Sequence, residues 1–339
     1  MRRFLILSLF LILSSLLLAA CTLPGSGDDT TTAPATTTPV TTATPAEEFL
    51  YEVSEDGNAV YICKYTGTAT EVVIPASIDG KPVTMIKGNF SNGTLAEGAF
   101  EGSALKTVVI PEGVTAIGLS AFADCTALTS VILPQSTARI LDEAFRGCTS
   151  LKHIDLSHTA VAQIGMSAFR SCEALEGVLF SPSLLTIQAF AFDGCSSLKK
   201  VALPSDLTSI GAGAFGNCSS LAHITVPPAL NLSNAETVPF HTLPALEKIE
   251  FAEGREEIVG YAFFATSTPV DIVIPASVKR FSSSPFFIHG EADIIFLGDC
   301  PEIVEGTDFY GAPTIYYDPA ASGWDACVWQ EHYPMIPIE

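Results

Sequence analysis

Two stretches of the chain, VTAIGLSAFADCTALTSVILP (residues 114–134) and LTSIGAGAFGNCSSLAHITVP (residues 207–227), align without a gap. They share the pattern apolar-Thr-x-Ile-Gly-x-x-Ala-Phe-x-x-Cys-x-x-Leu-x-x-apolar-x-apolar-Pro. A pattern of this length that returns along the chain indicates an internal repeat, and each copy of such a repeat is one structural unit.

The repeat extends well beyond these two copies. Its phenylalanine recurs at steps of 22–25 residues, at Phe100, Phe122, Phe145, Phe169, Phe192, Phe215, Phe240, Phe263 and Phe286. Its cysteine recurs at Cys125, Cys148, Cys172, Cys195 and Cys218. Its leucine recurs at Leu128, Leu151, Leu175, Leu198, Leu221 and Leu246. A period near 23 residues lies in the range of leucine-rich repeats, which predicts a solenoid with one unit per turn.

The residue order within one unit predicts its local structure. Leu-x-x-Val-x-Leu alternates apolar and other residues, as a short strand does, and a proline such as Pro134 or Pro227 then ends the strand. Ile-Gly turns the chain, and Ala-Phe fills the core beneath. One turn alone cannot cover its own apolar face, so we expect the turns to stack around a continuous core.

This unit resembles the BspA-type leucine-rich repeat of bacterial surface proteins, which is marked by Ile-Pro-x-x-Val-x-x-Ile-Gly-x-x-Ala-Phe-x-x-Cys-x-x-Leu. The resemblance covers about residues 74–297. It implies a right-handed, curved stack of short parallel strands with a cap at each end. It also implies an exported, non-enzymatic protein that is anchored at the surface and adheres to host proteins or other cells.

Two units depart from the pattern. The unit around residues 231–245 lacks Ile-Gly and is expected to place Thr242 in the cysteine column. In a later unit Ser284-Pro285-Phe286-Phe287 replaces the Ala-Phe element. We expect both units to be less regular.

The N-terminus has the layout of an export signal. Arg2 and Arg3 precede an apolar run from Phe4 to Ala20, and small residues lead into Cys21. Leu18-Ala19-Ala20-Cys21 resembles the bacterial lipobox, which implies that residues 1–20 are removed and that Cys21 carries a lipid. A plain signal peptide and an uncleaved anchor helix are the alternatives, and the run is at the short limit for a membrane span.

Three further segments complete the expected domain organisation. Residues 21–46 are read as a solvated tether, because ten of residues 22–46 are Thr and four are Pro. Residues 47–73 contain two aromatic-rich runs around Asp56-Gly57-Asn58, which predicts a capping hairpin. The solenoid spans 74–298, and residues 299–339 form a C-terminal cap. We expect Trp324 and Trp329 to close its last turn; the alternative is a platform for stacking carbohydrate.

Composition and motifs exclude several functions. The chain has 16 Lys+Arg against 37 Asp+Glu, a formal net charge of −21, which argues against nucleic-acid binding. No grouping of nucleophile, base and orienting residue marks a catalytic site. His153 and His158 are five residues apart without a second metal-ligand pair, so surface histidines are the simpler interpretation. We therefore expect neither an enzyme nor a cofactor nor a metal site.

The strand face is the candidate binding surface. Leu, Val and Leu of Leu-x-x-Val-x-Leu should point inward, and the positions between them should face the concave surface of the solenoid. From Lys106 to His223 these outward positions carry four lysines against Asp155 and Glu176 and expose Val109, Ile132 and Leu179. The candidate ligand-binding residues are Lys106, Lys152, His153, Lys199, Lys200, His223 and Lys248. The alternative is that these positions vary freely and that the lysines only deter edge pairing.

Two functions remain open at this stage. The first is a cell-surface lipoprotein, lipid-anchored outside a bacterial membrane and expected to be monomeric, whose solenoid binds an extracellular protein or cell-surface ligand. The second is an envelope scaffold or accessory subunit that binds a bacterial partner or a cell-wall polymer.

The five column cysteines should be reduced and packed as small apolar groups, because parallel side chains do not converge as a disulfide requires. Cys300 and Cys327, in the same terminal region, are left as the one plausible bridge.

Overall fold

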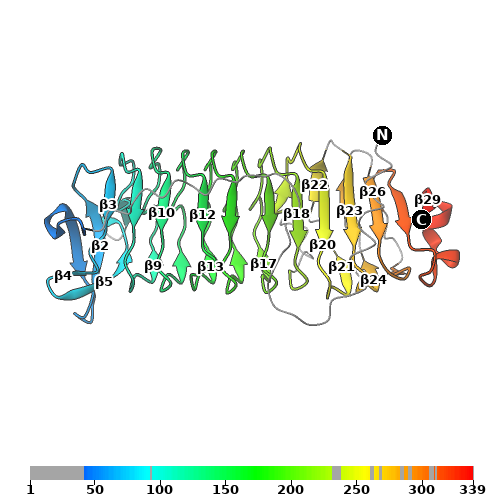
Figure 1. Cartoon of the computed structure of the whole chain (residues 1–339), viewed down its shortest axis with the longest axis horizontal. Helices are drawn as coiled ribbons and strands as arrows, with labels where there is room; N and C mark the ends of the chain where they lie inside the picture. The colour runs from blue at the N-terminus through cyan, green and yellow to red at the C-terminus, as the bar shows by residue number, and fades with distance from the viewer. Residues whose placement is uncertain are drawn as a thin grey trace. The chain divides into compact units, whose positions relative to one another are not determined.

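The computed structural model describes residues 42–91, 94–230, 238–259, 263–266, 269–282, 286–288, 292–304, 309 and 311–338. These residues form a β-solenoid of about 10 turns with about 23 residues per turn. Figure 1 shows the coils side by side in chain order, each crossing the solenoid with short strands. The predicted solenoid and its period are confirmed.

One side of the solenoid carries the Leu-x-x-Val-x-Leu strands, which pair in parallel from coil to coil. These strands are β3 (Glu71–Val73), β8 (Thr107–Val109), β10 (Ser130–Ile132), β12 (His153–Asp155), β14 (Gly177–Leu179), β16 (Lys200–Ala202), β18 (His223–Val226), β20 (Lys248–Phe251), β23 (Val270–Ile274), β26 (Ala292–Phe296), β28 (Thr314–Tyr317) and β29 (Met335–Pro337). We call this side the strand face. Its inward side chains, such as Leu105, Val108 and Ile110, are buried as predicted.

A second side holds the strands at the Ile-Gly position of the repeat, together with the strands of the N-terminal hairpin. Most belong to one sheet: β1 (Phe49–Val53), β2 (Val60–Tyr65), β5 (Lys81–Ile86), β9 (Ala116–Ile117), β11 (Arg139–Ile140), β13 (Gln163–Ile164), β15 (Thr186–Ile187) and β17 (Ser209–Ile210). Farther along, β21 (Glu257–Val259), β24 (Arg280–Ser282) and β27 (Glu302–Ile303) occupy the same position of the repeat. Two small antiparallel additions lie near the N-terminal end: β4 (Ser77–Ile78) on β5, and β6 (Asn89–Ser91) with β7 (Thr94–Glu97).

The third side changes character along the chain. In the coils from Phe122 to Phe215 it consists of turns. In later coils it consists of the parallel strands β19 (Phe240–His241), β22 (Phe263–Thr266) and β25 (Phe286–Ile288). The departures from the repeat pattern thus coincide with a different local structure. Residues 231–237 and Ser284-Pro285 themselves lie outside the described residues.

The repeated phenylalanines form one column through the core. From Phe100 to Phe240 the neighbouring rings are stacked, with centroids 4.8–5.6 Å apart and planes 3–13° from parallel. All of these rings are buried. The backbones of Phe263 and Phe286 continue in register with Phe240. The near-constant spacing in the sequence is therefore the spacing that keeps each ring on top of the previous one.

The cysteines form a second buried column, and all five are free thiols, as predicted. Each thiol donates a hydrogen bond to the backbone carbonyl of a phenylalanine in the neighbouring coil; Cys148 Sγ lies 3.1 Å from Phe122 O, and Cys172 Sγ lies 3.2 Å from Phe145 O. Burial raises the pKa of Cys172 to about 12, so this thiol keeps the proton that it donates. The prediction that these thiols are merely small apolar groups missed this bond.

The register of one irregular coil differs from the prediction. Thr242 does not stand in the cysteine column. It is exposed, has a φ of 55°, and occupies the position that Asn217 holds in the preceding coil, where Asn217 N donates to His241 O. The buried Leu243 takes the cysteine position, and its carbonyl accepts from Leu246 N as the Cys218 carbonyl accepts from Leu221 N. The core side of this coil requires an apolar residue, which leucine satisfies without a thiol.

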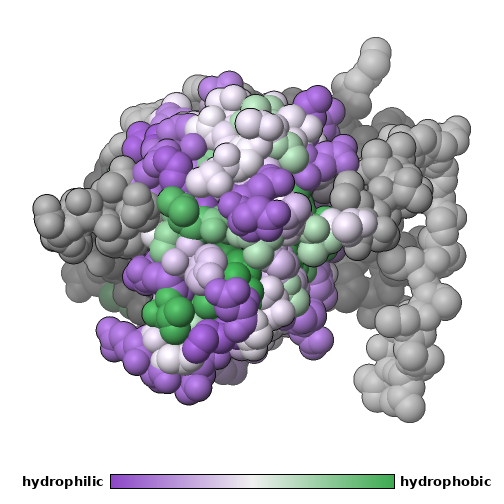
Figure 2. Space-filling view, turned by 90° about the vertical axis from the view of Figure 1, so that its left-hand side faces the viewer, coloured by the Kyte–Doolittle hydropathy of each residue, from purple (hydrophilic) through white to green (hydrophobic). Residues whose placement is uncertain are grey.

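The N-terminal end is closed by the antiparallel β1–β2 hairpin, with Gly57 in its turn at a φ of 72°. β1 is the edge of the sheet, and a register shift between Leu50 and Tyr51 interrupts its ladder, which discourages further pairing. Figure 2 shows hydrophilic and hydrophobic residues interspersed on this end. Thr44, assigned to the tether by composition, belongs to the fold because its backbone N–H donates to Val73 O at 2.8 Å.

At the C-terminal end, Trp324 and Trp329 are buried. Trp324 packs against Phe296 at 5.1 Å, and Trp329 packs against Phe281 at 5.6 Å. Rings packed in this way cannot stack on a sugar, so the carbohydrate platform is excluded and the predicted closure of the last turn is confirmed.

Candidate functional site

The candidate site consists of the outward residues of the strand face. The structure places Lys106, Lys152 and Lys199 just before their strands, at equivalent positions. The backbone carbonyls of these lysines accept hydrogen bonds from the next coil, from Thr129, Glu176 and Ala222. In the coil after each lysine, the equivalent position therefore holds another residue type. The lysines recur in every second coil, about 10 Å apart.

Lys200 and His153 add to this series from the next position along the strand. Lys106, Lys152, His153, Lys199 and Lys200 are all exposed. Among the described residues no salt bridge joins any of the four lysines to a carboxylate. We call these five residues the basic strip.

The other two predicted residues have acidic neighbours. His223 Nε2 lies 4.0 Å from Glu247, and Lys248 Nζ lies 3.2 Å from Glu250. Beyond them, Lys248 is in register with Asp271 of β23, which is in register with Asp293 of β26. The strand face therefore turns acidic after β18, a reversal that the sequence prediction did not extend far enough to find.

Apolar and acidic side chains lie among the lysines. Ile132 and Leu179 are 48% and 59% exposed, whereas Val109 is only partly exposed. Partial burial works against ionisation of Asp155, but hydrogen bonds from Ser157 and the nearby His158 outweigh it and lower the pKa of this carboxyl. Asp155 is thus a fixed negative charge, and a partner must match a mixed surface rather than a uniformly basic one.

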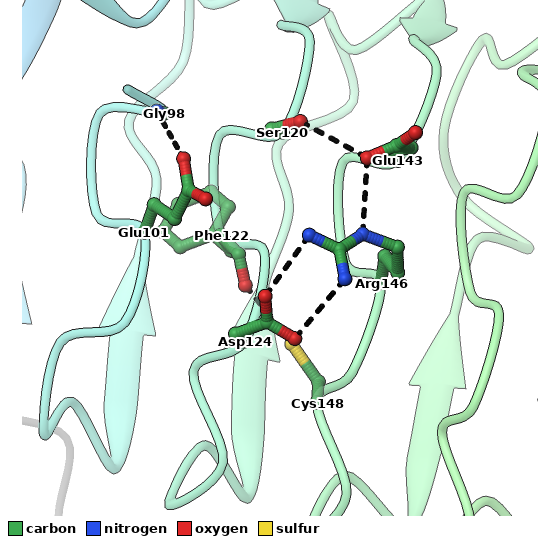
Figure 3. A network of polar contacts seen from close by, with 8 residues as sticks. All are labelled: Gly98, Glu101, Ser120, Phe122, Asp124, Glu143, Arg146 and Cys148. Carbon is green, nitrogen blue, oxygen red and sulfur yellow. Dashed lines mark hydrogen bonds and ion pairs between the residues drawn. The ribbon is translucent and has the colours of Figure 1, made fainter. Parts of the chain in front are cut away.

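A second charged array, on the turn side, was not predicted. Figure 3 shows Arg146 between Asp124 of the preceding coil and Glu143 of its own coil. Its guanidinium lies 2.9 Å from Asp124 and 3.0 Å from Glu143, and Ser120 Oγ lies 3.5 Å from the same Glu143 carboxylate. Arg146 and Asp124 are 22 residues apart, so only the coil register reveals this contact. Because each charge of the array has a partner within it, we assign the array to structure rather than to binding.

Among the described residues, His153 and His158 show no catalytic arrangement. His158 Nε2 lies 2.9 Å from Leu133 O, and its other ring nitrogen lies 3.8 Å from Asp155, while His153 is exposed on the strand face. Within the described ranges, no three His, Cys, Asp or Glu side chains gather as metal ligands would.

The described part of the chain also contains no helix with the length and apolar character to span a bilayer. Cys21 and the apolar run before it lie outside these residues.

Comparison with known protein families finds one that matches the repeats. The family model "BspA type Leucine rich repeat region" matches in 6 copies, over residues 93–192 and 162–289. No curated protein matches the chain. Proteins of this family are bacterial surface proteins, and leucine-rich-repeat solenoids are typically non-catalytic and generally bind protein ligands.

Solved structures of bacterial repeat proteins are also similar. A leucine-rich repeat protein of T. pallidum is 29% identical over 68% of this chain and 86% of its own, with a TM-score of 0.46. A leucine-rich cell surface protein of Faecalibacterium prausnitzii is 20% identical over 84% and 97%, with a TM-score of 0.41. The pneumococcal vaccine antigen PcpA is 17% identical over 89% and 100%, with a TM-score of 0.42. The repeats matched by the family model span more than half of the sequence, and on that ground this chain belongs to the BspA-type leucine-rich repeat family.

Proposed function

We propose that this protein is a lipid-anchored, non-enzymatic surface protein that binds an acidic extracellular protein through the basic strip. The observation that carries the proposal is the set of four exposed lysines that have no carboxylate partner among the described residues, on a chain with a net charge of −21. Exposed Ile132 and Leu179 supply apolar contact between them. A rigid row of coils holds these side chains in register, so little ordering is required when a partner binds.

Distant acids affect this surface less than the net charge implies. At 0.1 M salt, exposed charges farther apart than about 10 Å are largely screened from each other. A docking partner therefore interacts with the charges of the strip and its immediate neighbours rather than with the whole acidic molecule. The same screening should weaken the complex as salt is raised further.

Reversal of Lys106, Lys152, Lys199 and Lys200 to glutamate should reduce binding of an acidic protein about thirtyfold. Four exposed charge pairs at about 0.5 kcal/mol each amount to about 2 kcal/mol. The measurement is capture of extracellular proteins, with cell-wall polymer offered in parallel, by the Cys21→Ser protein with and without the four reversals. If the captured protein binds the four-fold variant unchanged, or if cell-wall polymer alone is retained, the proposed binding surface or its partner class is wrong.

Cys21→Ser should release the protein from the membrane or leave an uncleaved precursor, because lipid attachment and processing both require the thiol of Cys21. Membrane fractionation, with intact mass to identify the processed form, measures the outcome. A Ser variant that still partitions with membranes as a processed species would contradict the anchor. Cys63→Ser, which changes a thiol in the N-terminal β1–β2 hairpin, should leave partitioning as it is in the parent.

A further inference from the structure

The C-terminal cap brings together two cysteines that are 27 positions apart in the chain. Cys300 N donates to Ser322 O at 2.9 Å, and Cys327 N donates to Trp324 O at 3.3 Å, so backbone bonds hold both residues in place. Gly323, with a φ of 84°, lies between the two segments, and a Cβ there would stand only 3.3 Å from Cys300 Cβ. The absence of a side chain at this glycine lets the two segments approach.

The Cys300 and Cys327 thiols lie within hydrogen-bond reach of each other, and the Cys300 thiol also donates to Pro301 O at 3.7 Å. Both line one cavity of about 270 Å³, together with Gly323, Ala326 and Val328. The hydrogen bond from the Cys300 thiol, with a weaker one from Trp329 N–H, outweighs burial and lowers the pKa of Cys327 to about 7. The same contact, with burial, raises the pKa of Cys300. The pair is thus a thiolate beside a thiol that retains its proton.

A metal site does not explain the pair, because the described residues nowhere gather three His, Cys, Asp or Glu side chains. An inert pair of buried thiols does not explain it either, because Cys300 is partly exposed and both residues line a cavity. Cys327 itself is only 5% exposed, so a small disulfide must reach it through this cavity. Thiol–disulfide exchange requires a thiolate near neutral pH, such access, and a second thiol within reach.

We propose that Cys300 and Cys327 are a redox-active dithiol that a low-molecular-weight disulfide converts into a disulfide closing the C-terminal cap. The Cys327 thiolate attacks one sulfur of the incoming disulfide, forms a mixed disulfide and releases one thiolate. That thiolate takes the proton of Cys300, whose sulfur then displaces the second thiolate from Cys327. The incoming disulfide is reduced to one thiol and one thiolate, the latter taking a proton from water, and the cap gains one disulfide bond.

Glutathione disulfide is the probe. The reduced Cys21→Ser protein, which has eight thiols, is incubated with it, acid-quenched, unfolded and alkylated. We expect a mass loss of two hydrogen atoms, six alkylated thiols and one peptide pair joining Cys300 to Cys327. The oxidation rate should rise with pH up to about pH 7 and then level off, as the thiolate of Cys327 reaches full population.

Single variants assign the order of attack. Cys300→Ser keeps a hydrogen-bond donor beside Cys327 and should accumulate one glutathione on Cys327. Cys327→Ser should label at Cys300 about tenfold more slowly, because burial, which remains when Cys327 is replaced, raises the pKa of Cys300 and leaves little thiolate. Cys63→Ser is the control and should oxidise as the parent does. Circular dichroism verifies folding, and the peptide map of the parent decides the outcome if a variant unfolds.

Several results would overturn the proposal. The parent protein could keep all eight thiols, form a stable glutathione adduct without the Cys300–Cys327 link, or form a link through Cys63 or a column cysteine. Equal labelling rates in the two single variants would also contradict the proposal.

Discussion

Replacing Phe169 by alanine should lower the free energy of unfolding by about 3–5 kcal/mol. Phe169 is fully buried and lies between Phe145 and Phe192, with ring centroids 5.2 Å away on each side. The substitution removes one ring of the column and leaves a cavity that neighbouring coils cannot fill without losing register. Because each coil of a solenoid contacts mainly its neighbours, the defect also weakens coupling between the two halves of the stack.

Urea unfolding measures this loss, and the chain offers a matched control. Phe190 is also a phenylalanine of a central coil, but it is 39% exposed. The Arg170 guanidinium lies 5.8 Å from its ring centroid, and the ring also lies against Gly213. Phe190→Ala should cost less than about 1 kcal/mol. Equal costs for the two substitutions would show that the stacked column is not the core of the molecule.

Gly165→Ala should lower the free energy of unfolding by about 1–3 kcal/mol, because it overpacks the corner between two coils. A Cβ at Gly165 would stand 2.5 Å from Asp142 N and Leu141 C, which are backbone atoms and cannot rotate away. Gly118 and Gly211 make similarly close approaches, whereas Leu141 and Gln188 occupy the same position in the coils between them. The column alternates a glycine with a larger residue.

Gly177→Ala is the control for this substitution. At Gly177 a Cβ would meet only His153 Nδ1, at 3.5 Å, which is an ordinary contact. Alanine also suits a strand better than glycine, so stability should stay unchanged or rise slightly. Thermal unfolding of both variants measures the difference, and a Gly165→Ala protein as stable as the parent would show that the corner can relax.

The solenoid could be predicted from the sequence because its core is periodic. A buried ring at Phe122 and the next at Phe145 must occupy the same place in successive coils, so their spacing in the chain reports the length of a coil. The same periodicity made it possible to predict that the column cysteines are free thiols. Identical positions in parallel coils carry parallel side chains, and these do not converge as a disulfide requires.

Contacts that depend on neighbouring coils could not be predicted in the same way. The thiol of Cys148 meets the carbonyl of Phe122, and Arg146 meets Asp124, through a register that only the folded stack defines. The alignment of Thr242 was wrong because each column cysteine lies three residues after its phenylalanine, and the residue three after Phe240 is Leu243. Leu243 shows that burial, and not the identity of the side chain, defines the column.

The candidate site was predicted in part. The alternation of the strand residues identified which side chains face outward, and the exposed positions of Lys106, Lys152 and Lys199 agree with it. The carboxylates beside His223 and Lys248 were not anticipated, because they come from the next coil or from two residues along the same strand. Binding by these residues remains a proposal.

The most direct test of the account compares two charge-reversed proteins that have the same net charge. Lys152→Glu/Lys199→Glu changes the basic strip, and Arg139→Glu/Lys279→Glu changes exposed cations elsewhere. Affinity for poly-L-glutamate, the probe for an acidic protein surface, is measured between 0.1 and 1 M salt. The strip variant should bind about fivefold or more weakly than the parent at 0.1 M, with the difference vanishing at 1 M, where screening extends to about 3 Å. The other variant should bind as the parent does, and equal affinities for the two variants at 0.1 M would contradict the account.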